Sequence, residues 1–233
     1  TNGKSANNNK NVSIIATGSM AGGLVGFDDR TTAAYSIRNC STTLAKISGF
    51  FAGGISGLSY GKVSNVSVGN PANLEEKTEI TGFHAGGFAA GIADGFIKNS
   101  FVIATVKSCP TTGSYNGVSS VVNMEVSASA GYAVIISNNA QLAGNYAVVT
   151  FGGEGVSFST TADLEDKYVG GKFTGNIYQE SGAVTAPNIG TKLTQEQITG
   201  VGGDFSNFTR NIGCEGNAHD IWNLVAGQYP TLR

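Results

Sequence analysis

The sequence predicts an all-β fold, a right-handed parallel β-helix (β-solenoid) built from degenerate glycine-rich repeats of about 30 residues. Three observations predict it: a glycine motif recurs at nearly constant spacing, short β-branched runs separate the glycines, and the repeat shows no helical periodicity. Glycine contributes 34 of 233 residues, and charged residues only 13%, about half the usual share. Ser, Thr, Asn and backbone groups must therefore keep this chain soluble.

The clearest repeated element is the tripeptide Ala-Gly-Gly, which occurs at residues 21–23, 52–54 and 85–87. Successive copies start 31 and 33 residues apart (21 to 52, and 52 to 85). We expect the paired glycines to allow close backbone approach and positive φ at corners where a Cβ atom would clash. These structural glycines are Gly22, Gly23, Gly53, Gly54, Gly86 and Gly87.

A second shared element follows each Ala-Gly-Gly and has the pattern apolar residue, any residue, Asn. It places Asn39, Asn65 and Asn99 at equivalent positions. An Asn that recurs at a corner can form a ladder in which each side-chain amide bonds to the next coil. We therefore expect these three residues to be structural.

We expect one domain over residues 1–233, with repeat coils in 10–150 and less regular coils, loops and a cap in 151–233. Thr194-Gln-Glu-Gln197 fits a capping box and predicts a short helical turn. The only tryptophan, Trp222, lies near the C-terminal end. We expect it to cover the last open coil, because solenoid ends must be protected.

The repeat becomes less clear beyond residue 110, and we expect a degraded fourth copy at residues 127–139. Its version of the second element has two possible apolar positions and two possible asparagines. The alternatives are Ile135 or Ile136, with Asn138 or Asn139.

At these motifs the sequence resembles the GLUG-motif repeats of bacterial cell-surface, adhesin-like proteins. Residues 23–26 (Gly-Leu-Val-Gly) match the Gly-Leu-apolar-Gly core, whereas residues 54–57 and 87–91 match more loosely. The tail at residues 193–197 and 222–232 also looks like the segment that follows such repeats. The resemblance, clearest over the first 110 residues, implies a secreted β-solenoid on the outer surface of a Gram-negative bacterium.

Catalytic chemistry finds little support in the sequence. The two histidines, His84 and His219, do not form the His-Glu-x-x-His motif of a zinc peptidase. We expect no metal, no cofactor and no catalytic residue, and we interpret His219 beside Asp220, Cys214 and Glu215 as part of a capping turn. Cys40, Cys109 and Cys214 show no metal-binding spacing, so we expect three buried thiols, with one disulfide and a leftover thiol as the alternative.

Parallel β-helices also include polysaccharide lyases and glycosidases, which need paired carboxylates or a calcium site. The acidic candidates lie in insertions or turns, so we interpret them as solvated loop residues. They are Asp28 and Asp29 beside Arg30, Glu75 and Glu76 beside Lys77, and Asp94.

Aromatic residues give the remaining indication of function, because an exposed tyrosine can stack on a sugar ring. Tyr60 and Tyr115 are the candidate ligand-binding residues, whereas Phe50, Phe51 and Phe83 are expected to pack in the core or at corners. A net charge of −2 without a basic cluster argues against nucleic acid, and no apolar run is long enough to span a membrane.

These observations favour a non-catalytic adhesion or scaffold module, expected to be a monomer, that presents a solenoid face to a host or bacterial glycan or protein. The alternative is a carbohydrate-active β-helix enzyme. An ice-binding solenoid would need a regular Thr-x-Thr ladder, and Thr42 and Thr43 are not repeated at the aligned positions.

Overall fold

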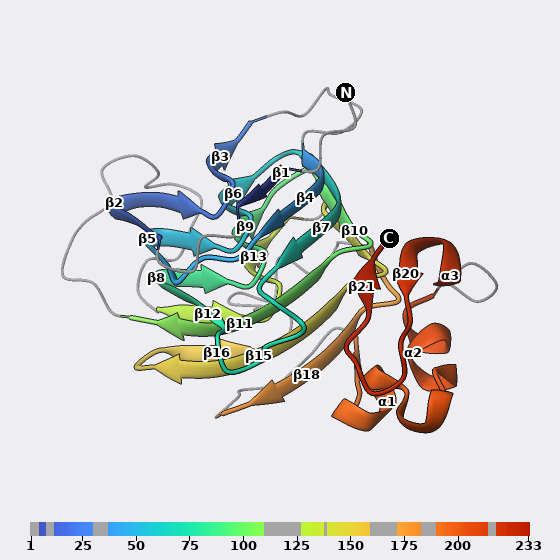
Figure 1. Cartoon of the computed structure of the whole chain (residues 1–233). Helices are drawn as coiled ribbons and strands as arrows, with labels where there is room; N and C mark the ends of the chain where they lie inside the picture. Colours follow the sequence, from blue (N-terminus) through green and yellow to red (C-terminus); the bar gives the residue numbers. More distant parts are fainter. Residues whose placement is uncertain are drawn as a thin grey trace.

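The fold is mostly β and consists largely of long parallel sheets (Figure 1). This computed structural model describes residues 5–7, 12–29, 37–109, 127–137, 139–158, 172–182, 190–213 and 218–233. The all-β class expected from the sequence agrees with this architecture.

Among the described residues the largest sheet has 15 strands. They are β1 (Ser5–Asn7), β2 (Ser13–Gly22), β4 (Ile37–Thr42), β5 (Lys46–Gly53), β7 (Lys62–Val68), β8 (Thr78–Gly86), β10 (Phe96–Lys98), β11 (Phe101–Ser108), β12 (Ala128–Ala130), β14 (Gln141–Ala143), β15 (Tyr146–Gly153), β16 (Val156–Phe158), β17 (Lys172–Thr174), β18 (Ile177–Ser181) and β19 (Thr191–Lys192). A second parallel sheet contains β3 (Val25–Asp28), β6 (Ser56–Ser59), β9 (Ala89–Ile92) and β13 (Ala133–Ile136).

Equivalent strands of successive repeat copies pair in parallel and in register. In the large sheet β2 pairs with β5 and β5 with β8, so that Ala21, Ala52 and Ala85 of the Ala-Gly-Gly motifs are direct neighbours. In the second sheet β3, β6, β9 and β13 pair in that order. The third strand of each copy, which lies at the repeated Asn, behaves in the same way, since β4 pairs with β7 and β7 with β10.

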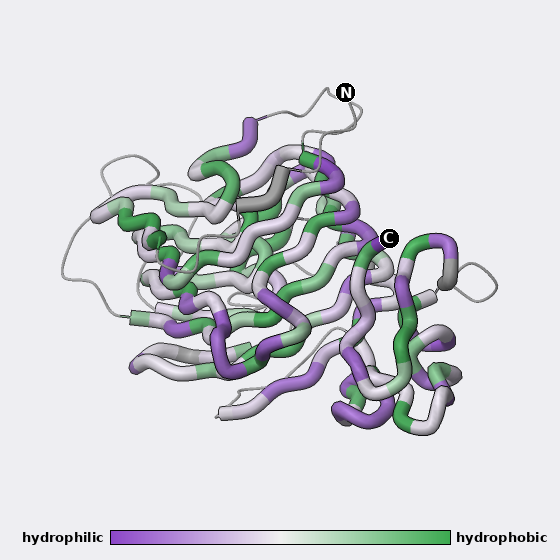
Figure 2. The backbone as a smooth tube through the Cα atoms, in the orientation of Figure 1, coloured by the Kyte–Doolittle hydropathy of each residue, from purple (hydrophilic) through white to green (hydrophobic). Residues whose placement is uncertain are grey.

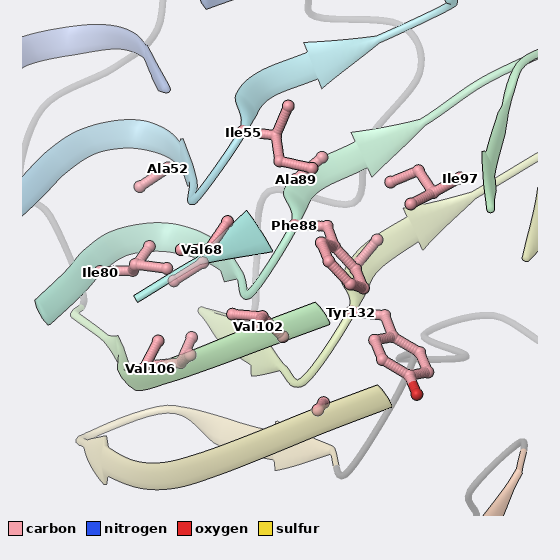
Figure 3. Packing of buried hydrophobic residues seen from close by; sticks show 14 of the residues in the cluster. Ala52, Ile55, Val68, Ile80, Phe88, Ala89, Ile97, Val102, Val106 and Tyr132 are labelled. Atoms are coloured by element: carbon pink, nitrogen blue, oxygen red, sulfur yellow. The ribbon is translucent and has the colours of Figure 1, made fainter. Parts of the chain in front are cut away.

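The main core lies on one side of these strands, where apolar residues of successive copies form continuous columns. One column contains Ile14, Ile47, Ile80 and Val106, and all but the first are fully buried. Figure 3 shows Ile80 with Val106 and further members of the same cluster. Figure 2 shows hydrophobic stretches interspersed with hydrophilic ones along the strands.

The paired glycines bring backbones of successive copies into contact. Gly54 N donates to Gly87 O at 3.1 Å, and a Cβ atom on Gly54 would lie 2.2 Å from that oxygen. The same close approach occurs in the neighbouring copies, where a Cβ atom on Gly23 would lie 2.3 Å from Gly54 O and one on Gly87 would lie 2.0 Å from Gly131 O. The expected positive φ is wrong, because the positive-φ glycines do not include any of the six motif glycines. Close approach alone therefore requires glycine at these positions.

We predict that Gly54→Ala destabilises the protein by about 3 kcal/mol, because the added methyl group overlaps the Gly87 carbonyl. Gly152→Ala is the matched control, since its Cβ would have no neighbour closer than Lys107 Cγ at 3.5 Å. Urea unfolding of the two variants measures the difference. Equal stabilities would show that the backbone contact does not constrain residue 54.

The second repeated element forms a column of left-handed residues. Asn39, Asn65 and Asn99 have φ values of 53°, 53° and 50°, and Asn65 Nδ2 donates to Asn39 Oδ1 at 3.2 Å. The strand register continues this column through Gly144 and Gly175, whose φ values are 65° and 63°. A residue that tolerates the left-handed region is therefore present in five successive copies.

This column corrects the expected position of the fourth copy. Ile135 and Ile136 lie in β13 and pair with β9, Asn139 donates to Asp94 Oδ1 at 3.0 Å, and Asn138 lies outside the described residues. The fourth copy of the element is instead Leu142-Ala-Gly144, which is paired in register with Ile97-Lys-Asn99. Glycine replaces Asn there because it adopts the same backbone conformation.

We predict that Asn65→Ala destabilises the protein by about 1 to 2 kcal/mol more than Asn65→Gly, because only alanine is strained at positive φ. Both variants lose the amide bond to Asn39, so their difference isolates the backbone requirement. Chemical denaturation of each variant checks it. If both lose the same stability, the side-chain bond explains the Asn.

One residue further along, the next column is polar and buried. Asn145 Nδ2 donates to Ile97 O at 2.8 Å and to Asn176 Oδ1 at 3.1 Å, while its Oδ1 accepts from Ser100 N at 3.0 Å. Asn176 Nδ2 donates to Leu142 O, the equivalent carbonyl of the next copy. This ladder satisfies its own polar groups inside the protein, as buried amides require.

The C-terminal segment packs on the other side of the large sheet, away from the main core. Its elements are α1 (Gln195–Thr199), the 3-10 turn η1 (Val201–Gly203), α2 (Ser206–Asn211), α3 (Ala218–Ile221), β20 (Trp222–Asn223) and β21 (Thr231–Leu232). The capping box at Thr194 and Gln197 is confirmed. Figure 1 shows these elements beside the sheet.

Trp222 does not cover the last copy, contrary to the expectation. Its ring contacts Phe101 and Tyr146, at centroid distances of 6.4 and 5.4 Å, in strands β11 and β15 of earlier copies. These aromatic residues alternate with Val102 and Ala147, which belong to the main core. Because β11 and β15 are apolar on both faces, the C-terminal segment has a lateral surface to cover.

Candidate functional site

A groove lies where the C-terminal strand β21 passes the outer side of β4 and β7. Its volume is about 370 Å³. The lining residues carry hydroxyl, amide, backbone and apolar groups. They are Ser41, Thr43, Ser67, Gly69, Asn70, Pro71, Phe101, Thr231 and Leu232.

The floor of the groove follows from the strand register. Ser41 and Ser67 are direct neighbours on β4 and β7, and Phe101 continues the column on β11. Ser67 lies between Val66 and Val68, which are both fully buried in the main core, so its side chain faces the other way. The groove therefore lies where the outer side of the sheet changes from serine to aromatic residues.

The wall opposite β21 is the turn that follows β7. Gly69 has a φ of 85°, and its N donates to Thr42 O at 2.8 Å. Asn70 Oδ1 then accepts from Ala72 N at 3.0 Å, which fixes the turn. Glycine is required at residue 69, because a Cβ atom there would lie 2.1 Å from Ile103 O.

The chemistry of the groove is that of a neutral polar surface. Each of its nine lining residues is uncharged. Four hydroxyl groups and one amide can donate and accept hydrogen bonds, and Pro71, Leu232 and the rim of Phe101 add apolar surface. The lining offers no carboxylate, imidazole or amine to act as a general acid or base.

The two candidate tyrosines do not lie in this groove. Tyr60 follows β6 in the second sheet, where it packs edge-to-face on Phe27 with ring centroids 5.8 Å apart. Its N donates to Asp28 O at 2.7 Å. Tyr60 is half-buried and Phe27 is 45% exposed, so the pair forms a small exposed aromatic surface. Tyr115 lies outside the described residues.

The acidic candidates have separate local environments. The expectation of a solvated loop residue is wrong for Asp28, because it ends β3 and is buried, where it accepts from Ser59 Oγ at 3.3 Å. Asp29 is exposed, and Arg30 lies outside the described residues. Asp94 accepts from Asn139.

The second pair, Glu75 and Glu76, is exposed in the turn after β7. Its neighbour Lys77 donates to Thr150 Oγ1 at 2.8 Å. Cys214 and Glu215 are outside the described residues, among which no three His, Cys, Asp or Glu side chains gather as metal ligands would.

Sequence reasoning missed an ion-pair network across three strands. Glu79 on β8 lies between Lys46 on β5, at 3.0 Å, and Lys107 on β11. The hydrogen bond from Lys107 is the main cause that lowers the pKa of the Glu79 carboxyl. Only the parallel register brings these residues together, because Lys46 pairs with Glu79 itself and Lys107 pairs with Thr81, two residues further along β8.

His84 is fully buried in an aromatic cluster beside the second sheet. The Phe51 ring stacks on it at 5.7 Å and Phe83 meets it edge-on at 4.8 Å. Among the described residues neither ring nitrogen has a hydrogen-bond partner. Burial lowers the pKa of His84 to about 4, because the charged ring would have no water or counter-ion.

The cysteine expectation needs correction. Cys40 is half-buried and its Sγ donates to Arg38 O at 3.2 Å, whereas Cys109 is exposed at the end of β11. Cys40 is a free thiol. The expected burial of all three cysteines is therefore wrong, because β11 ends at Ser108 and leaves Cys109 exposed.

Comparison with protein-family models, with curated proteins and with solved structures finds no match. Within the described part of the chain, no helix has both the length and the apolar character needed to cross a bilayer.

We predict that acid destabilises the protein through His84. The unfolded-state pKa is near 6.5 and the folded one about 4, so the unfolded chain binds more protons between these values. Stability should therefore fall by about 2 to 3 kcal/mol as the pH is lowered from 6.5 to 4. Denaturant unfolding at several pH values measures this slope.

The variant His84→Leu should lose most of that pH dependence, because leucine has no proton to gain. His219→Leu is the control and should keep it. A slope that persists in His84→Leu would assign the acid sensitivity to another group.

Proposed function

We propose that the chain is a β-solenoid module of the outer surface of a Gram-negative bacterium, with a non-catalytic role in adhesion or as a scaffold. In this proposal the groove between β4, β7 and β21 binds an uncharged glycan segment. The groove lining carries the proposal, because its hydroxyl and amide groups with adjacent apolar surface are what recognition of a neutral sugar uses.

The strand order supports a solenoid. One copy of the repeat runs through β5, β6 and β7, the next through β8, β9 and β10, and each strand pairs with its counterpart. A chain that passes three sheet positions in turn and returns to the first winds as a coil. We infer a right-handed coil, since parallel crossover connections are right-handed in about 98% of cases.

The groove lining supports a role in presentation rather than catalysis. Hydrolysis of a glycosidic bond needs two carboxyl groups on opposite sides of the bond, and the groove lining holds no carboxyl group. The resemblance to GLUG-motif repeats adds the surface location and the adhesive role. A carbohydrate-active enzyme is the alternative that the experiment must separate.

We expect the purified chain to bind neutral glycans on an array and to release no reducing sugar from the same polysaccharides. Ser67→Trp should weaken binding by at least about tenfold, because the indole would fill the groove floor, and tenfold corresponds to about 1.4 kcal/mol. The matched control is Thr191→Trp, at an exposed strand position outside the groove lining.

Unchanged binding by Ser67→Trp would reject the groove as the glycan site. Release of reducing sugar by the wild-type chain would favour the enzyme. If no glycan binds, a protein ligand becomes the better account.

A further inference from the structure

We propose that two molecules of this chain associate through the edge strands β2 and β3 at the N-terminal end of the sheets. The inference is independent of the proposed glycan binding. It departs from the monomer expected on the sequence, because composition and motifs do not show which strand edges remain unpaired.

Both strands have an unpaired edge among the described residues. β2 pairs only with β5, and β3 pairs only with β6. Figure 1 shows β2 at one end of the large sheet and β18 at the other. A row of free N–H and C=O groups on an edge strand is a ready template for another strand.

The core is also incompletely covered at this end. Ile14 and Leu24 are only partly buried, whereas Ile47 and Ile55, which follow them in the next copy, are fully buried. Three of the five exposed large apolar residues among the described ones lie here, and the other two lie in the C-terminal segment. The three are Val12 at 36%, Ile15 at 66% and Phe27 at 45% exposed.

The opposite end also has edge strands, since β13, β16 and β17 each pair with only one strand among the described residues, but it offers no comparable exposed apolar patch. Its large apolar residues Phe151, Phe158 and Tyr178 are buried. Glu180 continues the column of the core residue Val149 and is bonded to Lys192 at 2.8 Å. An added strand would have to bury this charged pair, which costs free energy.

A second molecule therefore offers one surface among the described residues that combines an unpaired edge with exposed apolar side chains, namely the same end of its own sheets. The regular part of β2 is Ser13–Ala16, because the register with β5 shifts before Met20. Two such segments can pair antiparallel around a twofold axis that places Ile15 of one molecule directly opposite Ile15 of the other. This contact uses the same patch on both molecules and closes after two subunits.

The mass of the 233-residue chain in solution tests the proposal. Sedimentation equilibrium from about 10 to 200 µM, the range suited to a small interface, should approach twice the chain mass of 23.8 kDa. Ile15→Lys should remain at the single-chain mass. The matched control Val201→Lys changes an equally exposed residue in the C-terminal segment and should dimerise like the wild type.

A single-chain mass for the wild type at every concentration would overturn the proposal, and so would equal dimerisation of both lysine variants. A monomer would leave the edge to a strand from a different protein.

Cross-linking checks the geometry. Because Cys109 is exposed, the background variant is Cys109→Ser. In it, Ile15→Cys should form an intermolecular disulfide on mild oxidation, since paired residues near a twofold lie within about 5.5 Å. Val201→Cys should not. Cross-linking of both variants to the same extent would contradict a contact through β2.

Discussion

The contact between glycine backbones of successive copies is the constraint on which the rest of the structure depends. Gly54 approaches Gly87 so closely that a single methyl group has no room between them, and the same is true one copy earlier and one copy later. Because the corners are fixed at backbone distance, the strands on either side keep their register. That register produces the apolar columns of the core, the left-handed column at Asn65 and the buried amide ladder at Asn145. Each of these is a consequence of equal spacing between copies.

The sequence predicts the repeat well and its details less well, for reasons that particular residues make clear. The glycine pairs allow close backbone approach and the asparagines tolerate positive φ. Both properties belong to the residue type itself, so the positions of these residues predict the corners of the first three copies. Gly144 does not fit the pattern of apolar residue, any residue, Asn. The backbone at this position requires only a residue that tolerates positive φ, so the pattern was too narrow to predict it. Ser100 and Asn176 look like ordinary polar residues in the sequence. Only the register shows that both form hydrogen bonds with Asn145 inside the protein.

The groove was not predictable for a different reason. Ser41, Ser67 and Leu232 come from three distant parts of the chain, and they meet only because the C-terminal segment packs against the sheet. Tyr60 was selected by residue type, and the structure places it on another sheet with Phe27. Residue type was therefore enough to select Tyr60 as a candidate, whereas the groove depends on how β21 packs against β4 and β7.

The lateral packing of Trp222 also has a consequence for how the protein is made. Phe101 and Tyr146 are synthesised before Phe208 and Trp222, which cover them. Folding can begin at the N-terminal side during translation, so the outer side of β11 and β15 stays uncovered until the segment around Trp222 has emerged. A nascent chain that pauses before this segment would expose an aromatic surface to chaperones, and emergence of the segment would cover that surface in a separate docking step.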